Sequence, residues 1–267
     1  MAGLCVIEGG AASDSQGPPL LFVHGACLAA WCWQDHFLEY FNQHDHRTFA
    51  VDLRGHGSSP GYEQLQDATI DDFVDDVSEV ASGFAVPPVV IGHSMGGLIA
   101  QRFVQRCPVS GIVLLAPAPI RGMRRRGAAL VRAHPLAFLK AAITRDMLKI
   151  YPDNQHVRYF MFSPETAENI VSNCRRRLQS ESWRACMEMN DPVSPPLNIS
   201  CPMLVLGGEL DHTVPVVEVI ETGKAYQAQI RIFSGVGHNL MLEASWQAVA
   251  DSIHGWLQTS LQHCNSW

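Results

Sequence analysis

The stretch that decides the fold is "VVIGHSMGGLIAQRF", which runs from Val89 to Phe103. Its first residues form an apolar run typical of a buried strand, and its last residues have the apolar spacing of a helix. Between them Gly92, Ser94 and Gly96 give the spacing G-x-S-x-G, which is short enough to occur by chance. Ser94 is therefore either a nucleophile on a sharp turn or a polar residue in a glycine-rich bend, and other parts of the chain must decide.

The bulk composition fits one large domain with a substantial apolar core. The chain has 267 residues, of which 47% are hydrophobic and 17% charged, which is normal for a single α/β domain that carries an insertion. No apolar run approaches the roughly 20 residues that span a bilayer. The first fifteen residues have neither a basic region nor a long apolar one, so we expect no signal peptide. These observations predict a cytoplasmic protein without a membrane span.

Charge is distributed unevenly along the chain. Residues 118–199 carry 13 Lys and Arg against 7 Asp and Glu, whereas the remainder carries 6 against 19. A basic segment within an acidic chain suggests a separately built insertion. We expect no nucleic-acid partner, because the aromatic-rich basic surface typical of such proteins is missing. The eight cysteines contain no C-x-x-C pair, so we expect mostly buried thiols, no metal site and no cofactor.

Short apolar runs recur along the chain and alternate with helical patterns. Near-continuous apolar runs indicate strands that are buried on both faces, as in a parallel sheet covered by helices. Between residues 118 and 199 this alternation ends, and the sequence shows helical patterns without intervening apolar runs. We therefore predict an α/β fold in which 1–117 and 200–267 form a mostly parallel central sheet flanked by helices. A helical cap, 118–199, is inserted after the strand at 110–119. The predicted strands are 19–26, 47–57, 87–94, 110–119, 201–211 and 228–238.

Three residues with complementary chemistry end three of these strands. Ser94 ends the third, Asp211 the fifth and His238 the last, and the carboxyl ends of parallel strands carry the functional loops. A serine hydroxyl is a poor nucleophile unless a neighbouring base removes its proton. His238 would be that base, and Asp211 would orient its imidazole and stabilise the imidazolium. We expect these three side chains to meet.

Five motifs together resemble the α/β-hydrolase superfamily of serine hydrolases over essentially the whole chain: "FVHGA", "DLRGHGSS", "GHSMGG", "LGGELD" and "GVGHNLMLE". The chain order Ser, Asp, His is that of the superfamily's triad. "FVHGACLAAWCW" is also similar to the plant-type methylesterases and their hydroxynitrile lyase relatives. "DLRGHGSS" looks more like the broad group of bacterial esterases and lysophospholipase-like enzymes. The resemblance implies the α/β-hydrolase fold and a carboxylesterase-type activity.

The oxyanion of a tetrahedral intermediate needs two preorganised donors. We expect them to be the backbone amides of Ala26, in the first loop, and Met95, at the start of the helix after Ser94. Apolar, methionine-rich surroundings would suit an apolar or aromatic group of the substrate. The predicted substrate contacts are Cys27, Leu28 and Trp31 from the first loop and Phe138, Phe160 and Met161 from the cap.

Other ionisable residues are expected to support the site rather than react. His93 points away from the nucleophile, and Asp191 is a poor second choice for the acid. We expect loop-shaping roles for His24, Asp52 and His56. The arginine runs 124–126 and 175–177 would either bind an anionic group of the substrate or form a solvated face.

The leading hypothesis is a serine hydrolase that cleaves a carboxylic ester with an apolar acyl or alcohol group through an acyl-enzyme. A carbon–carbon bond hydrolase on the same triad and a triad-bearing small-molecule receptor stay open as alternatives. Hydroxynitrile lyases carry threonine and lysine where this chain has Gly25 and Asn239, and both differences favour hydrolysis. The partner is expected to be a small-molecule ester, and the sequence predicts no oligomeric state.

Overall fold

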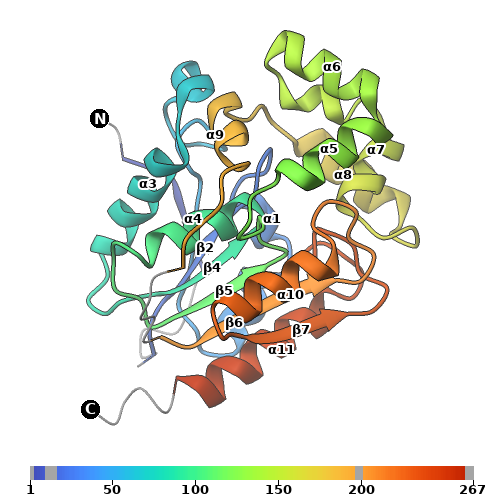
Figure 1. Ribbon diagram of the computed structural model, residues 1–267. Helices are drawn as coiled ribbons and strands as arrows, with labels where there is room; N and C mark the ends of the chain where they lie inside the picture. The colour runs from blue at the N-terminus through green and yellow to red at the C-terminus, as the bar shows by residue number, and fades with distance from the viewer. Residues whose placement is uncertain (1–2, 10–16, 196–200, 262–267) are drawn as a thin grey trace.

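The computed structural model describes residues 3–9, 17–195 and 201–261, and it places one seven-stranded sheet at the centre of the molecule (Figure 1). The strands lie in the order β1-β3-β2-β4-β5-β6-β7. They are β1 (Val6–Glu8), β2 (Leu20–Val23), β3 (Thr48–Val51), β4 (Val89–His93), β5 (Gly111–Leu115), β6 (Met203–Gly208) and β7 (Gln229–Phe233).

Strand β1 pairs with β3 in the antiparallel direction, and all the other neighbouring strands run parallel. The prediction of a mostly parallel sheet flanked by helices is therefore confirmed. The sequence analysis missed β1, because three residues are too few to give a recognisable apolar pattern.

Helices cover both faces of the sheet, since successive strand residues point to opposite sides. Leu20 and Phe22 of β2 belong to one buried cluster, and Leu21 and Val23 belong to the other. The first cluster includes side chains of α1 (Trp31–Gln34), α2 (Phe37–Gln43) and α11 (Trp246–Ser260). The second includes side chains of α3 (Ile70–Ser82), α4 (Met95–Phe103) and α10 (Val216–Ala225). A 3₁₀ turn, η1, spans Tyr62–Asp67 before α3.

Between β5 and β6 the chain forms a series of short helices beyond one end of the strands, with α5 to α8 close together and α9 apart from them, beside η1 (Figure 1). They are α5 (Arg124–Ala133), α6 (Pro135–Thr144), η2 (Met147–Ile150), α7 (Asn154–Met161), α8 (Glu168–Arg177) and α9 (Trp183–Glu188). We call this group the inserted helices. The division into a core and a cap of 118–199 stays a prediction, and its second boundary falls on residues 196–200, outside the described residues.

Two predicted elements differ in detail. The apolar spacing of the sequence at 33–43 is that of one helix, but the chain forms α1 and α2 with a break at Asp35 and His36. Strand β7 was expected to be buried on both faces, yet most of its side chains are partly or fully exposed. The reason is its place at the edge of the sheet.

None of the helices in the described ranges has the length and apolar character needed to cross a membrane.

The turn from β4 into α4 brings backbone atoms into close contact. A Cβ atom at Gly92 would lie 2.3 Å from the carbonyl oxygen of Gly96, and one at Gly96 would lie 2.3 Å from the carbonyl oxygen of Val23. Only glycine fits at these two positions without a backbone shift.

We expect Gly92→Ala to lower the free energy of unfolding by about 3 kcal/mol, because the added methyl overlaps the backbone. The matched control is Gly255→Ala in α11, where an added Cβ meets nothing within 4 Å. That change should raise stability by about 0.5–1 kcal/mol through helix propensity. Urea unfolding of both variants measures the difference, and equal effects would contradict the close packing at Gly92.

Candidate active site

Ser94 lies between β4 and α4 in an unusual backbone conformation. Its φ of 52° and ψ of −115° put a non-glycine residue at positive φ, a strained state that clusters at functional sites. The turn is fixed from both sides, since the Ser94 amide donates to the carbonyl of Leu115 and the Ser94 carbonyl accepts from Ala118, both at 3.0 Å. The half-buried hydroxyl is thereby held at the wall of a cavity.

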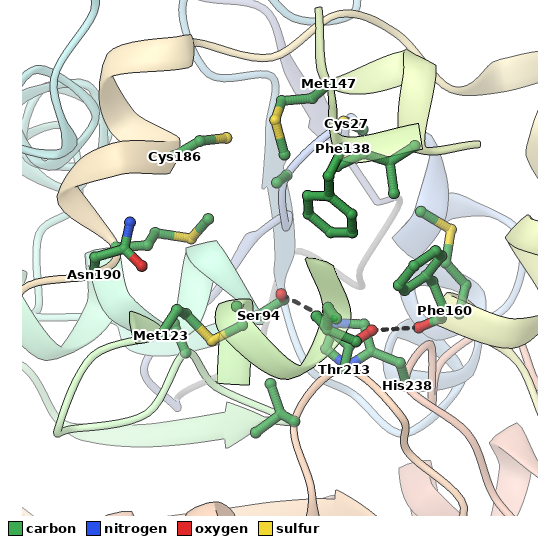
Figure 2. Close-up of a pocket in the computed structure, with 18 of the residues that line it drawn as sticks. Cys27, Ser94, Met123, Phe138, Met147, Phe160, Cys186, Asn190, Thr213 and His238 are labelled. Atoms are coloured by element: carbon green, nitrogen blue, oxygen red, sulfur yellow. Dashed lines mark hydrogen bonds between the residues drawn. The ribbon is translucent and has the colours of Figure 1, made fainter. Parts of the chain in front are cut away.

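A chain of hydrogen bonds joins Ser94 to the two residues predicted as its partners. Figure 2 shows the first of these bonds, between Ser94 and His238. The Oγ of Ser94 lies 3.0 Å from Nε2 of His238, and Nδ1 of His238 lies 2.7 Å from Oδ2 of Asp211. Because a carboxylate only accepts, Nδ1 carries the proton and Nε2 is free to accept the serine proton. The second Asp211 oxygen accepts from the amides of Thr213 and Val214 at 2.7 and 2.8 Å, which fixes the carboxylate. The geometry brings the three side chains together, and their catalytic roles stay a prediction.

The two amides predicted as oxyanion donors are free of protein acceptors. Among the described residues neither the Ala26 nor the Met95 amide makes a hydrogen bond. Ala26 lines the cavity next to Ser94. The Met95 side chain is buried in the cluster on the α3, α4 and α10 side of the sheet, so only its backbone can serve the site. Their role as oxyanion donors stays a prediction.

A cavity of about 510 Å³ opens above Ser94 and His238, between the strand ends and the inserted helices. Most of the predicted substrate contacts line it, namely Cys27, Leu28, Phe138, Phe160 and Met161. Trp31 does not. It lines a separate depression beside Asp35, where the guanidinium of Arg177 stacks over its ring at 4.0 Å. The helix that starts at Trp31 turns this side chain away from the strand ends.

Sequence reasoning missed much of the remaining lining. These residues come from α5 and the turn before it, from η2, from α9 and the turn after it, and from the loops after β6 and β7. Only their packing brings them to one cavity. Thr213 also ties this loop to the inserted helices, because its hydroxyl donates to the carbonyl of Phe160 at 2.7 Å (Figure 2). The further lining residues include Met123, Leu130, Ile150, Tyr151, Cys186, Met187, Met189, Asn190 and Asn239.

His93 holds the backbone of His238 through a hydrogen bond. Its Nε2 lies 3.1 Å from the backbone carbonyl of His238, so this nitrogen must carry a proton, while Nδ1 has no partner among the described residues. Burial and the nearby His238 lower the pKa of His93 well below its ordinary value. A Cβ at Gly25 would lie 2.8 Å from His93 Nδ1 and 3.0 Å from Ser94 Cβ. The threonine of the hydroxynitrile lyases therefore has no room here without a shift.

Glu181, which sequence analysis missed, is a buried carboxylate that links the inserted helices to the first loop. It accepts hydrogen bonds from the Cys27 amide (3.0 Å), the Ser182 amide (2.7 Å) and Nε2 of His56 (3.0 Å). Nδ1 of His56 faces only the carbonyl of Arg54, at 3.0 Å, so both ring nitrogens must donate and the ring is a cation. Burial opposes this charge, but Glu181, the Arg54 carbonyl and Asp52 together outweigh burial and raise the pKa of His56. No local pattern marks Glu181, since its partners lie 125 and 154 residues away.

His24 and Asp52 fix the conformation of loops through hydrogen bonds to backbone groups, as expected. Nε2 of His24 accepts from the Leu53 amide at 3.2 Å and Nδ1 donates to the Gly25 carbonyl, which requires a neutral ring. Burial and the nearby His56 lower the pKa of His24 to about 3.

The remaining candidate acids and arginines lie outside the triad. Asp52 accepts from two loop amides, and Asp191 is exposed beside Arg124. Of the arginine runs 124–126 and 175–177, only Arg124 lines the cavity. Within the described ranges no group of three or more His, Cys, Asp or Glu residues could hold a metal ion.

Comparison with known proteins places the chain in a family. The sequence model of the Alpha/beta hydrolase family matches residues 20–252, so the chain belongs to the α/β hydrolase family. The mouse protein phosphatase methylesterase 1 is 41% identical over 91 residues, which cover 33% of this chain and 24% of that protein. The epoxide hydrolase 3 of Xenopus tropicalis is 24% identical over 83% of this chain and 66% of its own length.

Two further matches extend over most of the chain. The monoacylglycerol lipase of Mycolicibacterium smegmatis is 24% identical and covers 80% of this chain and 79% of its own. A putative non-heme bromoperoxidase from Mycobacterium tuberculosis has a TM-score of 0.78 at 22% identity, over 97% of this chain and 96% of that one. The structural likeness confirms the fold. The chain spans about a quarter to two thirds of the length of the first curated relatives that it matches.

We expect Glu181→Gln to lower the free energy of unfolding by about 3 kcal/mol, because the change leaves the buried His56 cation without its counter-charge. The amide that replaces one oxygen would also face donors only. Glu79→Gln, on the exposed side of α3, is the matched control and should change stability by less than about 0.5 kcal/mol. Urea unfolding at neutral pH measures both, and equal stabilities would show that the buried pair is not needed.

Acid should destabilise the protein through its neutral buried histidines. His24 and His93 have pKa values below their ordinary 6.5, so each takes up a proton on unfolding below pH 6.5. Each should therefore reduce the free energy of unfolding by up to about 1.4 kcal/mol per pH unit as the pH falls. His56 acts in the opposite sense: its raised pKa contributes stability that is present below pH 6.5 and is lost as the pH rises through that pKa. Urea unfolding between pH 7 and 4 gives the free energy of unfolding at each pH. Its slope against pH should be smaller for His93→Asn than for the wild type by the equivalent of about one proton. Identical slopes would contradict a neutral His93.

Proposed function

We propose that this protein is a serine hydrolase that cleaves a carboxylic ester with an apolar acyl or alcohol group through an acyl-enzyme. The observation that carries the proposal is the hydrogen-bonded chain Ser94–His238–Asp211 at the wall of an apolar cavity. The two unpaired amides of Ala26 and Met95 support it, because acyl transfer needs donors for the oxyanion.

The chain's own groups account for each step. His238 Nε2 removes the proton of Ser94 as Oγ attacks the ester carbonyl, and the amides of Ala26 and Met95 stabilise the oxyanion. Collapse of the intermediate breaks the bond to the alcohol oxygen, which takes the proton from His238. Water then attacks the acyl-enzyme with His238 again as base, and the acid is released. Asp211 keeps the proton on Nδ1 and stabilises the imidazolium in both halves of the reaction.

The cavity and the relatives favour an ester. Its lining is mostly aliphatic, aromatic and methionine side chains, which suit an apolar acyl or alcohol group. Two of the relatives are named as a methylesterase and a monoacylglycerol lipase. The epoxide hydrolases that resemble this fold carry Asp at the position of Ser94, and that difference argues against epoxide hydrolysis here.

We expect an active-site phosphonate probe to label the wild type once, at Ser94, and to leave Ser94→Ala unlabelled. A panel of esters of increasing acyl length should then show turnover that falls by up to roughly 10⁶-fold in Ser94→Ala if chemistry limits the rate. Mass spectrometry locates the label. Equal labelling of both proteins would overturn the proposal, and labelling without turnover of any ester would favour the carbon–carbon hydrolase or receptor alternative.

The acid is tested by a matched pair of variants. Asp211→Asn should lower kcat by roughly 10⁴-fold, because the amide favours the wrong histidine tautomer. Asp191→Asn, at an exposed carboxylate beside Arg124, should leave kcat within a factor of about two. Steady-state kinetics on one ester compare the two, and a larger loss at Asp191 would show that Asp211 is not the acid.

A further inference from the structure

The helical hairpin of α5 and α6 concentrates positive charge in an otherwise acidic protein. Residues 121–145 contain seven Lys and Arg and no Asp or Glu, although the whole chain has a net charge of −7. In Figure 1 α6 lies at the outer end of the inserted helices, far from the sheet, and α5 lies nearer the sheet. The segment therefore presents a basic surface that the body of the protein does not cover.

Most of these cations lack an acidic partner. Arg121 pairs with Glu221 and Arg124 with Asp191, and Arg126 donates to the carbonyl of His212. The other four make no ion pair with any described residue. The four cations whose side chains pair with no described residue are Arg125, Arg132, Lys140 and Arg145.

The same hairpin exposes large apolar side chains. Leu136, Leu139 and Ile143 are 72%, 56% and 75% exposed, and their spacing of three and four residues puts them on one face of α6. Exposed apolar surface costs roughly 25 cal/mol for each Å² left in water. An apolar patch bordered by basic residues typically marks an interaction site.

Exposed apolar surface of the inserted helices continues into the cavity at Ser94. Val131 of α5 is 43% exposed and also lines the cavity. Met187 of α9 is likewise both exposed and part of the lining. Phe138 lines the cavity from the side of α6 opposite to Leu136, Leu139 and Ile143. Apolar surface thus extends from the cavity to the outside at Val131 and Met187, while α6 separates the cavity from its own exposed face.

We propose that the α5–α6 hairpin docks this protein on an anionic phospholipid bilayer. Leu136, Leu139 and Ile143 would enter the boundary between headgroups and acyl chains, as the apolar face of an interfacial helix does. The four unpaired cations would lie at the level of the lipid phosphates, where each strengthens binding. Binding would present the cavity mouth to lipid-dissolved molecules. A nucleic acid fits less well, because it offers nothing to the exposed leucine and isoleucine side chains.

Docking is tested by sedimentation with vesicles of phosphatidylcholine alone and of phosphatidylcholine mixed with phosphatidylglycerol. We expect binding to the mixed vesicles only, weakened by added salt. Replacing all four cations with Gln (Arg125, Arg132, Lys140 and Arg145) should weaken binding by roughly 100-fold or more, at about fivefold per cation. Leu136→Ser, Leu139→Ser and Ile143→Ser together should weaken it by at least about tenfold.

Matched controls change the same kinds of residue elsewhere. Tyr62→Ser with Val217→Ser removes exposed apolar side chains from η1 and α10, and Lys224→Gln with Arg184→Gln removes two surface cations. Both controls should bind as the wild type does. Losses as large in the controls as in the hairpin variants would overturn the proposal. The proposal would also be overturned if only the cation changes weakened vesicle binding and the protein bound heparin equally well, because that would indicate a site for polyanions. A dimer that forms with rising protein concentration and is lost in the hairpin variants would overturn it too.

The proposal does not depend on ester hydrolysis, so the two can fail separately. Vesicle binding by Ser94→Ala should equal that of the wild type. Turnover of a water-soluble short-chain ester should be unchanged in the hairpin variants, whose residues lie outside the cavity lining. Failure to bind anionic vesicles with normal turnover would overturn docking alone. Normal binding without turnover would overturn only the proposed function.

Discussion

The rest of the site depends on the turn at Ser94. A serine at φ 52° is strained, and it is held there by hydrogen bonds to the neighbouring strand and by glycines whose missing Cβ atoms let β4, α4 and the end of β2 approach. The strain is sustained by the packing of the whole central sheet, because the contacting atoms belong to different strands. As a consequence, the Ser94 hydroxyl is held outside α4 and faces Nε2 of His238.

A second constraint joins the inserted helices to the site. The buried Glu181 carboxylate between α8 and α9 holds both the Cys27 amide and the His56 cation. Cys27 has a positive φ of 63° and follows Ala26, which lines the cavity. A charge pair in the interior is costly unless each group is fully hydrogen-bonded, and here the carboxylate accepts three bonds. The position of the first loop therefore depends on the inserted segment as well as on the sheet.

The inserted helices also separate two kinds of surface. On their inner side they contribute apolar side chains to the cavity, and on their outer side α5 and α6 carry exposed leucine, isoleucine and unpaired cations. A short helix between a cavity and solvent would normally place polar residues outward. The departure from that pattern in α6 is the physical reason to look for a partner at this surface.

The sequence by itself predicted the mostly parallel sheet, six of its seven strands and the sharp turn at Ser94. Buried strands give continuous apolar runs, and glycine is required wherever backbones meet. It also predicted Asp211 and His238, because parallel strands bring their carboxyl ends to one edge.

Only the tertiary structure decided which side chains line the cavity, that Trp31 lies outside it, and that Glu181 reaches the first loop. These features depend on how short helices pack against one another across more than a hundred residues, and no local pattern encodes such distances. The exposed face of α6 was equally invisible in the sequence, because apolar spacing alone does not distinguish a helix face in the core from one left in water.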